Sequence, residues 1–526
     1  MHTEEKTSTL NQFGLFRIHR TRFLILMFSL VILVGVLGWF VHSFFWLYAL
    51  VLPILFVGLW DLNFTTDTIL RNFPFLGHFR YMSLRIAPEL HQYFVEGNTK
   101  GTPFNKLQRD MVDRRAEKHL ETHPFGTELD VYREYYDWLP HSIYPKDIQK
   151  ELPRVRVGGS ECKQPYDAAV LNISAMSFGS LSAAAIRALN RGAKNGGFYH
   201  NTGEGGVSPY HEEAGADLVW EIGSGYFGCR SESGDFSEKL FSEIASKETI
   251  KMIEIKLSQG AKPGHGGVLP GLKNTPEIAK IRNVKPYTKV VSPAYHKAFS
   301  DASGLLEFVR HLRQLSGGKP VGFKLCIGRT EEFVDICRAM IETGICPDFI
   351  TVDGGEGGTG AAPPEFSDSV GMPLEEALVF VTDTLRGYDL KKDIRVIASG
   401  KIISGFDMLK AFALGVDICN SARGMMFALG CIQALKCDTD ECPTGIATHN
   451  PNLTRGLIVS AKAERVTNFQ GETVKAALEL LAGMGLERLD ELNRRHIKKR
   501  VNGVGTTSFE KIYPTVEAGA YRSSRG

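Results

Sequence analysis

The sequence predicts a (β/α)8 barrel with an N-terminal transmembrane helical hairpin and helical accessory segments. Three features predict this fold class: a long apolar stretch near the amino terminus, eight short β-branched runs that alternate with helical patterns, and glycine-rich loops directly after several of those runs. The expected order is a cytoplasmic tail at 1–22, the hairpin at 23–60, a helical or irregular accessory region at 61–154, the barrel at 155–455 and a helical C-terminal segment at 456–526.

The apolar stretch from Phe23 to Leu59 approaches twice the roughly 20 residues that one spanning helix needs. Two short spans that turn near His42 and Ser43 fit this length better than one long span. A cleavable signal peptide, the other alternative, would have a shorter core and a small-residue cleavage site. Arginines flank both ends of the stretch, so the positive-inside rule predicts a two-span anchor in the inner (cytoplasmic) membrane, with lipid as a partner and the rest of the chain in the cytoplasm.

The barrel is predicted from the alternation of strand-like and helix-like segments along the chain. From about residue 165, short apolar runs alternate with helical patterns such as 182–195, and eight such units match a closed barrel in size. An open doubly wound sheet is the rival, but its glycine fingerprint after the first run is missing. The last seventy residues, with the basic run at 494–500, are expected to be helical and to pack on the barrel exterior. The expected strands lie at 168–176, 196–201, 216–222, 252–257, 321–326, 348–353, 394–399 and 416–421.

Charge and cysteine usage narrow the function classes. The 61 basic and 59 acidic residues give a formal net charge of +2, without the basic stripe that phosphate backbones attract, so nucleic acid is not expected as a partner. The nine cysteines are scattered except for Cys431, Cys437 and Cys442. This clustering indicates a reducing compartment and a metal site rather than a disulfide framework, with three ordinary core thiols as the alternative.

Glycine-rich loops follow the apolar runs at the rim where the carboxyl ends of barrel strands meet. They include 176–179, 201–206, 258–264 and 354–360. Glycine lets the backbone approach a flat ligand closely and offers amide donors, although such loops also occur without a ligand. Their repeated placement on one rim predicts a ligand site there.

The seventh and eighth units point to an anion. They end in Ser399-Gly400-Lys401 and Ser421-Ala422-Arg423-Gly424, and phosphate groups commonly bind at the loops after strands seven and eight of such barrels. Lys401 or Arg423 would add positive charge. The alternative is that Gly400 closes a tight turn and Arg423 is a solvated surface residue.

Five motifs then resemble the successive signatures of the FMN domain of the glutamate synthase family, in order, over roughly residues 155 to 455. They are MSFGSLS, NTGEGG, KLSQGAKPGHGG followed by LPG, DGGEGGTGAAP and GCIQALKCDTDECPTGIAT. The resemblance implies FMN as cofactor and a reaction in which 2-oxoglutarate and ammonia give 2-iminoglutarate, which is reduced to L-glutamate. The cofactor would do the hard step while the protein orients and polarises.

The resemblance also implies roles for individual residues. Gln259, Lys262 and Arg282 would bind the oxoglutarate carboxylates, Glu204 would line the substrate pocket, and Lys324 would lie by the flavin ring. Glu204, Lys262 and Lys324 are the expected catalytic groups. For each cation the alternative is a surface salt bridge. The expected FMN contacts are Ala175, Met176, Ser177, Asn201, Lys324, Asp353, Gly354, Gly355, Gly358, Thr359, Ser399, Gly400, Lys401, Ala422, Arg423 and Gly424.

The C-x5-C-x4-C spacing of Cys431, Cys437 and Cys442 resembles the spacing that this family uses for a three-iron, four-sulfide (3Fe-4S) cluster. Three thiolates suffice for such a cluster because it lacks the fourth iron corner. Pro443 after the last cysteine is similar to many iron-sulfur loops.

The sequence departs from the family pattern in places. No glutaminase domain is expected, because the chain starts at Met1-His2 and runs into the apolar stretch. The family's Glu and Gln in the GAKPGEGGQLPG element are His265 and Val268 here, and its I-E-D element reads Ala302-Ser303-Gly304. These departures weaken the case for glutamine coupling, so free ammonia is the expected nitrogen source unless another polypeptide supplies it. No nucleotide-binding subunit is expected, so the electrons should come from ferredoxin, a separate reductase or a membrane-linked donor. Two alternatives remain open: a flavoenzyme that acts on another oxo acid or amine, and a membrane-bound electron-transfer or scaffold protein without substrate turnover.

Overall fold

The structure, a computed structural model, describes residues 20–122, 124–149 and 151–522. The chain divides into two compact units, residues 1–101 and 102–526. Most of the tail expected at 1–22 lies outside the described residues. The domain boundaries expected from the sequence stay predictions.

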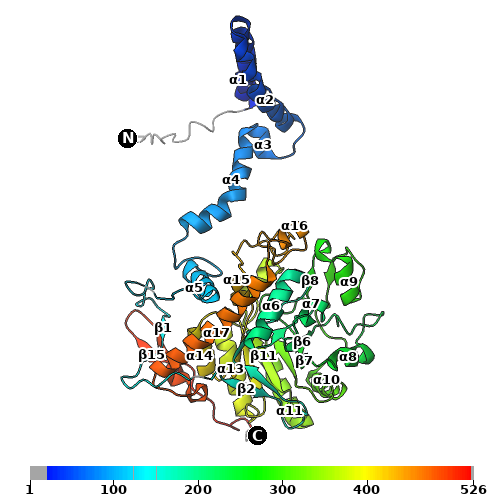
Figure 1. Cartoon of the computed structure of the whole chain (residues 1–526), viewed down its shortest axis with the longest axis vertical. Coiled ribbons are helices and arrows are strands. Elements are labelled where there is room, and N and C mark those ends of the chain that lie inside the picture. Colours follow the sequence, from blue (N-terminus) through cyan, green and yellow to red (C-terminus); the bar gives the residue numbers. More distant parts are fainter. Residues whose placement is uncertain (1–19, 123, 150, 523–526) are drawn as a thin grey trace, which may run out of the picture. The chain divides into compact units, whose positions relative to one another are not determined.

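The first unit contains an antiparallel helical hairpin (Figure 1). Helix α1 (Arg20–Phe40) and helix α2 (Tyr48–Asn63) are joined by a 3-10 turn at His42–Leu47, so the turn expected near His42 is confirmed. Tyr48 Oη donates a hydrogen bond to Val31 O at 2.9 Å across the pair. Among the described residues, α1 and the run His42–Asn63 are long and apolar enough to cross a membrane.

Short helices follow in the same unit. They are α3 (Thr68–Asn72), which is capped by the Asp67 side chain, and α4 (Leu76–Leu90), which runs into a π-helical turn at His91–Val95. The sequence predicted helical and irregular structure over 61–154, and the described residues at 68–95 are mostly helical.

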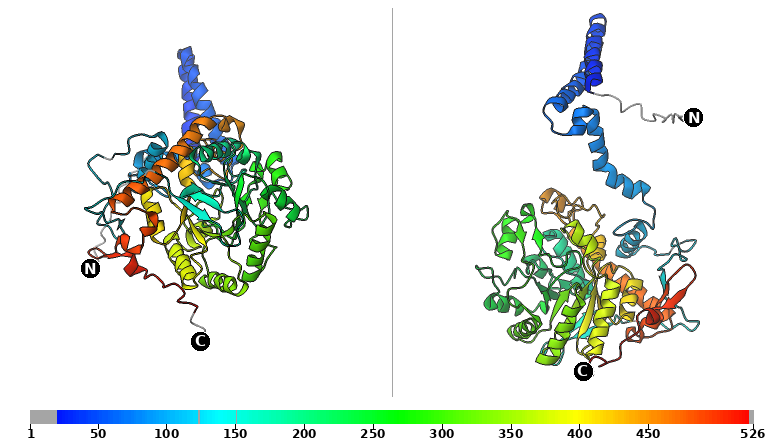
Figure 2. Two further views of the ribbon diagram at one scale, coloured as in Figure 1. Left: turned by 60° about the horizontal axis from the view of Figure 1, so that its bottom comes forward. Right: turned by 180° about the vertical axis from the view of Figure 1, so that it is seen from behind.

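The second unit is built on a closed barrel of eight parallel strands, which confirms the predicted fold class (Figure 2). Their order around the barrel is β10-β11-β12-β13-β4-β5-β6-β7. The strands are β4 (Leu171–Ile173), β5 (His200–Asn201), β6 (Leu218–Ile222), β7 (Ile250–Lys256), β10 (Val321–Leu325), β11 (Phe349–Asp353), β12 (Arg395–Ser399) and β13 (Ile418–Ser421).

Helices surround these strands. The helix α6 shows why the chain alternates: Ser182 caps its first turn, and Gly197 ends it in the left-handed region at φ 65°, which returns the chain to β5. The helices of this unit are α5 (Lys106–Glu117), α6 (Ala183–Gly196), α7 (Pro209–Glu212), α8 (Glu238–Ala245), α9 (Pro276–Arg282), α10 (Ala302–Leu315), α11 (Thr330–Thr343), α12 (Pro364–Ser369), α13 (Leu374–Gly387), α14 (Gly405–Ala413), α15 (Arg423–Ala428), α16 (Pro451–Thr454), α17 (Val459–Gly483) and α18 (Phe509–Ile512).

A β-hairpin closes the amino-terminal end of the barrel. Strands β2 (Arg154–Val157) and β3 (Tyr166–Ala169) pair antiparallel, and Gly159 N donates to Asp348 Oδ1 at 2.7 Å just before β11. A separate buried cluster at this end combines side chains of the hairpin with one from each of several barrel strands. Side chains therefore fill this end of the barrel, and a functional site is expected at the opposite end, where the strands have their carboxyl ends.

Three sequence expectations differ in detail. The run at 168–176 is two strands, because Ala168 and Ala169 pair with β2 while the next residues join the barrel. The run at 196–201 keeps two strand residues, because Gly196 still belongs to α6. The basic run at 494–500 is not helical: it forms a 3-10 turn at Arg494–His496 and strand β14 (Lys498–Arg500), which pairs with β1 (Asp137–Trp138) and β15 (Thr506–Ser508). Helix α17 packs on the outer helices α5, α6 and α14.

Candidate active site

A cavity of about 330 Å³ lies at the carboxyl ends of the barrel strands, the end that the glycine loops predicted. Most of the predicted site residues line it. From the predicted substrate, cofactor and metal sets these are Ala175, Met176, Ser177, Glu204, Gln259, Lys262, Arg282, Lys324, Asp353, Gly358, Thr359, Ser399, Gly400, Lys401, Ala422, Arg423, Gly424, Cys431, Cys437 and Cys442.

Three predicted residues do not line the cavity. Asn201 Nδ2 donates to Glu254 Oε1 at 2.8 Å inside the barrel. Gly354 N donates to Ser399 O at 2.9 Å, and Gly355 N donates to Met372 O at 2.8 Å. A Cβ at Gly355 would meet the backbone of Gly371 at 2.8 Å, so this glycine allows close packing of loops. These three residues therefore hold the strands and loops around the cavity in place and do not form its wall.

Lys324 stands at the centre of a buried charge network. Its Nζ forms an ion pair with Glu221, and Glu254 Oε1 lies 3.8 Å away. Burial opposes the charge of Lys324, but Glu221, Glu254 and Asp353 raise its pKa above the ordinary value. Burial raises the pKa of Glu254 to about 7, against the opposing effect of Lys324. Lys324 is therefore a permanent cation at the cavity floor.

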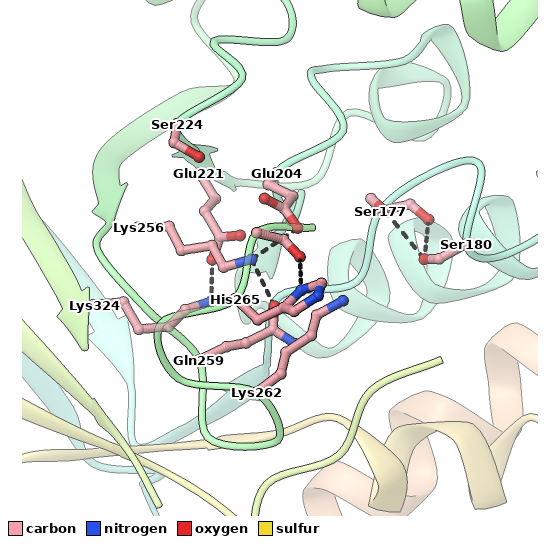
Figure 3. A network of polar contacts seen from close by, with 12 residues as sticks. Ser177, Ser180, Glu204, Glu221, Ser224, Lys256, Gln259, Lys262, His265 and Lys324 are labelled. Atoms are coloured by element: carbon pink, nitrogen blue, oxygen red, sulfur yellow. Dashed lines mark hydrogen bonds and ion pairs between the residues drawn. The ribbon is translucent and has the colours of Figure 1, made fainter. Parts of the chain in front are cut away.

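Lys256 orients two predicted substrate residues. Its Nζ lies 2.7 Å from Glu204 Oε1 and donates to Gln259 Oε1 at 2.5 Å, and Figure 3 shows the three side chains converging. Burial would raise the pKa of Glu204, but Lys256, Lys262 and Arg282 lower it below the ordinary value. Glu204 is thus an ionised carboxylate at the cavity wall.

Lys262 and Arg282 are buried cations, 3% and 5% exposed, that form no ion pair with a carboxylate of the described residues. Lys262 Nζ donates to Ala361 O at 2.7 Å, and an Arg282 Nη donates to Phe178 O at 3.0 Å. Burial lowers the pKa of Lys262 to about 8 and that of Arg282 to about 10, although Glu204 opposes both shifts. Arg282 Nε has no hydrogen-bond partner among the described residues. Such groups are expected where an anionic ligand completes the site.

A second pair of cations lines the cavity beyond strands β12 and β13. Burial lowers the pKa of Arg423, although the nearby carboxylates of Asp353 and Glu356 act to raise it. Burial and the neighbouring Arg423 both lower the pKa of Lys401. Lys401 and Arg423 repel one another, so an anion bound between them would be stabilised. Gly400, which has φ 147°, precedes Lys401 in this loop.

The cysteine loop borders the same cavity, so all three thiols predicted as metal ligands share one space. Within the described part of the chain, no three His, Cys, Asp or Glu side chains are grouped closely enough to hold a single metal ion. Burial raises the pKa of Cys431 to about 11, whereas hydrogen bonds to Thr444 and nearby amides lower that of Cys442 despite burial. Gln433, Leu435 and Asp440 take left-handed φ values of 56°, 55° and 64°.

Several residues that line or support the cavity were not predicted. Lys256, Glu221 and Glu254 lie in apolar strands, and charged residues inside such runs were the signal that could have marked them. Lys273 Nζ donates to Ser180 O at 2.6 Å and to the carbonyls of Cys437 and Ala447, both at 3.1 Å. Those partners are far apart in sequence, so no local pattern reveals Lys273.

Comparisons with known proteins agree with this geometry. Residues 145–487 match the family described as a conserved region in glutamate synthase. The glutamate synthase large subunit-like protein YerD of Bacillus subtilis is 36% identical over 480 residues, which cover 82% of this chain and 90% of that protein. An archaeal-type glutamate synthase (NADPH) of Thermotoga neapolitana is 34% identical over 338 residues, which cover 64% of this chain and 63% of that protein.

Likeness to solved structures is weaker. A mandelate oxidase variant with 2-hydroxy-phenylacetamide reaches a TM-score of 0.41 at 15% identity, covering 82% of this chain and 96% of that chain.

Proposed function

The chain belongs to the glutamate synthase family of oxidoreductases, which act on CH-NH2 donors, and on that premise we propose that it reduces 2-iminoglutarate, formed from 2-oxoglutarate and ammonia, to L-glutamate with FMN as cofactor. One observation carries the proposal: Lys262 and Arg282 are buried, lack carboxylate partners among the described residues, and line one cavity with Lys324. A dicarboxylate needs at least two cations, and a buried cation without a counterion is expensive unless a ligand supplies one.

The chain's residues fit FMN. Lys401 and Arg423 face the cavity at one end and suit its phosphate, while Lys324 and Asp353 lie on the cavity floor. A Cβ at Gly358 would meet Arg423 Cδ at 2.8 Å, so glycine lets the loop approach this cation without displacing its side chain. When bound, reduced FMN supplies a hydride to the α-carbon of the imino acid.

The protein's part is to bind, orient and polarise. Gln259, Lys262 and Arg282 hold the two substrate carboxylates, and burial strengthens these contacts because water is excluded. The ionised Glu204, positioned by Lys256, accepts a hydrogen bond from the substrate nitrogen. Lys324, kept charged by Glu221 and Glu254, stabilises negative charge on the reduced flavin ring.

The cysteine loop is proposed to hold a 3Fe-4S cluster through Cys431, Cys437 and Cys442. Support comes from the shared cavity wall and from three non-glycine residues in left-handed conformations, which are unfavourable unless something imposes the loop shape. The cluster would pass electrons from a separate donor, ferredoxin or a reductase, to the flavin.

Anaerobic single turnover tests the reaction. Photoreduced protein is mixed with 2-oxoglutarate and ammonium, and the flavin spectrum and glutamate formation are followed together. We expect flavin reoxidation that depends on both substrates and yields glutamate in equal amount. A rate of flavin reoxidation that depends on neither substrate would contradict the proposed reaction and would favour an electron-transfer flavoprotein without substrate turnover.

A second candidate is reduction of another oxo acid or an amine. Val268, which stands where the family has glutamine, lines the cavity and makes its wall less polar. The same assay with monocarboxylic 2-oxo acids separates the candidates. Faster reoxidation with an apolar oxo acid than with 2-oxoglutarate would favour the second.

We also propose that α1 and α2 anchor the protein in the inner membrane with residues 102–526 in the cytoplasm. The length and apolar composition of α1 and of the run His42–Asn63, which includes α2, support this placement. Carbonate extraction and protease digestion of a C-terminally tagged chain in spheroplasts test it. A tag that is cleaved from the periplasmic side would contradict the orientation.

A further inference from the structure

Phe104 reaches the proposed cofactor cavity from the accessory region, in which the sequence indicates no chemistry. Its side chain is fully buried, and together with Pro103 it lines the cavity. The centre of its ring lies 4.8 Å from Arg423 Cζ and 5.9 Å from Lys401 Nζ, both on the ring face. One aromatic ring therefore lies close to Arg423 and, at longer range, to the exposed Lys401, the two cations that we assign to the flavin phosphate.

Gln433 of the cysteine loop holds the Phe104 backbone in place. Phe104 N donates to Gln433 Oε1 at 3.2 Å, and Gln433 Nε2 donates back to Phe104 O at 3.1 Å and to Thr102 O at 3.3 Å. Arg109 donates to the same Phe104 carbonyl at 2.7 Å. Gln433 lies between Cys431 and Cys437, so one side chain joins the cysteine loop to the segment that carries the ring.

The segment after Phe104 is rigidly fixed as well. Asn105 begins α5 with a capping box in which its side chain accepts from Gln108 N at 3.0 Å. Helix α5 packs against α15, which begins at Arg423, and against α17. Phe104 is therefore presented to the cavity by ordered structure.

We propose that Phe104 is a positioning residue for the flavin phosphate and that Gln433 couples phosphate binding to the state of the cysteine loop. An aromatic face over a guanidinium attracts the cation and keeps water from one side of it, which strengthens its attraction to a phosphate on the other side. The mutual repulsion of Lys401 and Arg423 is reduced by the same ring. Coupling is reciprocal: a loop that holds Gln433 in place favours phosphate binding, and phosphate binding favours that loop. The inference rests on the proposed FMN cofactor.

A comparison of FMN with riboflavin, which lacks the phosphate, tests the role of the ring. Detergent-solubilised full-length protein is stripped of flavin, and the dissociation constants of both are measured by flavin fluorescence. We expect Phe104→Leu to weaken FMN binding by about 2- to 30-fold and to leave riboflavin binding nearly unchanged. Phe104→Tyr, which keeps the aromatic face, should restore the wild-type FMN value.

Phe380→Leu is the matched control, because Phe380 is a half-buried aromatic residue on α13 that does not line this cavity. It should change neither constant. Equal losses of FMN and riboflavin affinity in Phe104→Leu would make Phe104 an ordinary wall residue and overturn the inference, as would no loss of either. Wild-type protein that binds neither flavin would instead overturn the proposed function.

A double-variant cycle tests the coupling. We expect Gln433→Leu and Cys437→Ser each to weaken FMN but not riboflavin binding, and we expect the double variant to lose no more affinity than the larger single loss. Iron content, measured in parallel, should fall in Cys437→Ser. Losses that add in the double variant, or a Gln433→Leu protein with wild-type FMN affinity, would refute the coupling.

Discussion

The charge of each lysine in the cavity depends on what surrounds it. Lys324 is buried beside two carboxylates and keeps its proton. Lys262 forms no ion pair with a carboxylate of the described residues, and burial lowers its pKa to about 8 although the charge of Glu204 opposes the shift. Lysine is therefore a permanent cation at position 324, whereas at position 262 it is a substrate-binding group that loses its proton near pH 8.

Substrate binding should accordingly depend on the protonation of Lys262. Below pH 8 the side chain is a cation, and above it the free protein loses this charge, so affinity for 2-oxoglutarate should fall by up to about ten-fold per pH unit above pH 8. The measurement is the change in flavin absorbance on titration with 2-oxoglutarate between pH 6.5 and 9.5. Lys262→Arg, whose guanidinium stays protonated, should remove the inflection. An inflection that persists in this variant would exclude Lys262 as its source.

Removal of the Lys324 cation should destabilise the barrel. Lys324→Met leaves Glu221 and Glu254 buried without their partner, and breaking such a group costs about 3–5 kcal/mol at pH 8. The folded pKa of Glu254 already lies above its unfolded value, so its contribution to stability is greatest below about pH 4.5 and is lost as the pH rises through about 7. The destabilisation by Lys324→Met should therefore shrink toward pH 5.

Chemical unfolding of the solubilised protein, followed by near-ultraviolet circular dichroism, measures this effect. Lys392→Met is the control, because Lys392 is exposed and pairs with Asp389 on the surface. It should change the free energy of unfolding by less than about 0.5 kcal/mol. A Lys324→Met cost that does not depend on pH would contradict the assigned network.

At the scale of elements, strand alternation and the cysteine loop decide which side chains meet. In β7, Glu254 and Lys256 lie two residues apart, and residues at this spacing share one face of a strand, so both project toward the barrel interior network. The loop from Cys431 to Cys442 is irregular instead, and its shape follows from left-handed residues and from tertiary contacts.

The cysteine loop gives a prediction at this scale. Cys437→Ser should abolish the iron signal, measured by metal analysis and electron paramagnetic resonance, while circular dichroism shows the barrel still folded. Cys346→Ser should keep the iron, because Cys346 follows α11 outside the cavity wall. Unchanged iron content in the Cys437 variant would refute the ligand assignment.

At the scale of the whole molecule, the residues of the cavity wall all belong to the unit of residues 102–526. A chain of residues 102–526 should therefore fold without the hairpin, stay in the supernatant after ultracentrifugation and bind FMN with the dissociation constant of the full chain. Gel filtration and flavin fluorescence measure both. A truncated chain that aggregates or loses FMN affinity by more than about ten-fold would show that the first unit supports the site.

The sequence by itself determined the barrel, the hairpin and the rim, because hydrophobic periodicity and glycine placement are local consequences of helix and strand geometry. The five ordered motifs and the loops after units seven and eight then indicated twenty of the residues that line the cavity. Only the tertiary structure revealed that Lys256 orients Glu204, that Lys273 joins three loops and that Phe104 covers Arg423. These contacts join residues that lie tens to hundreds of positions apart. The effect of these contacts on charge and pKa depends on burial and on the distances between side chains, and both are set only when the chain folds.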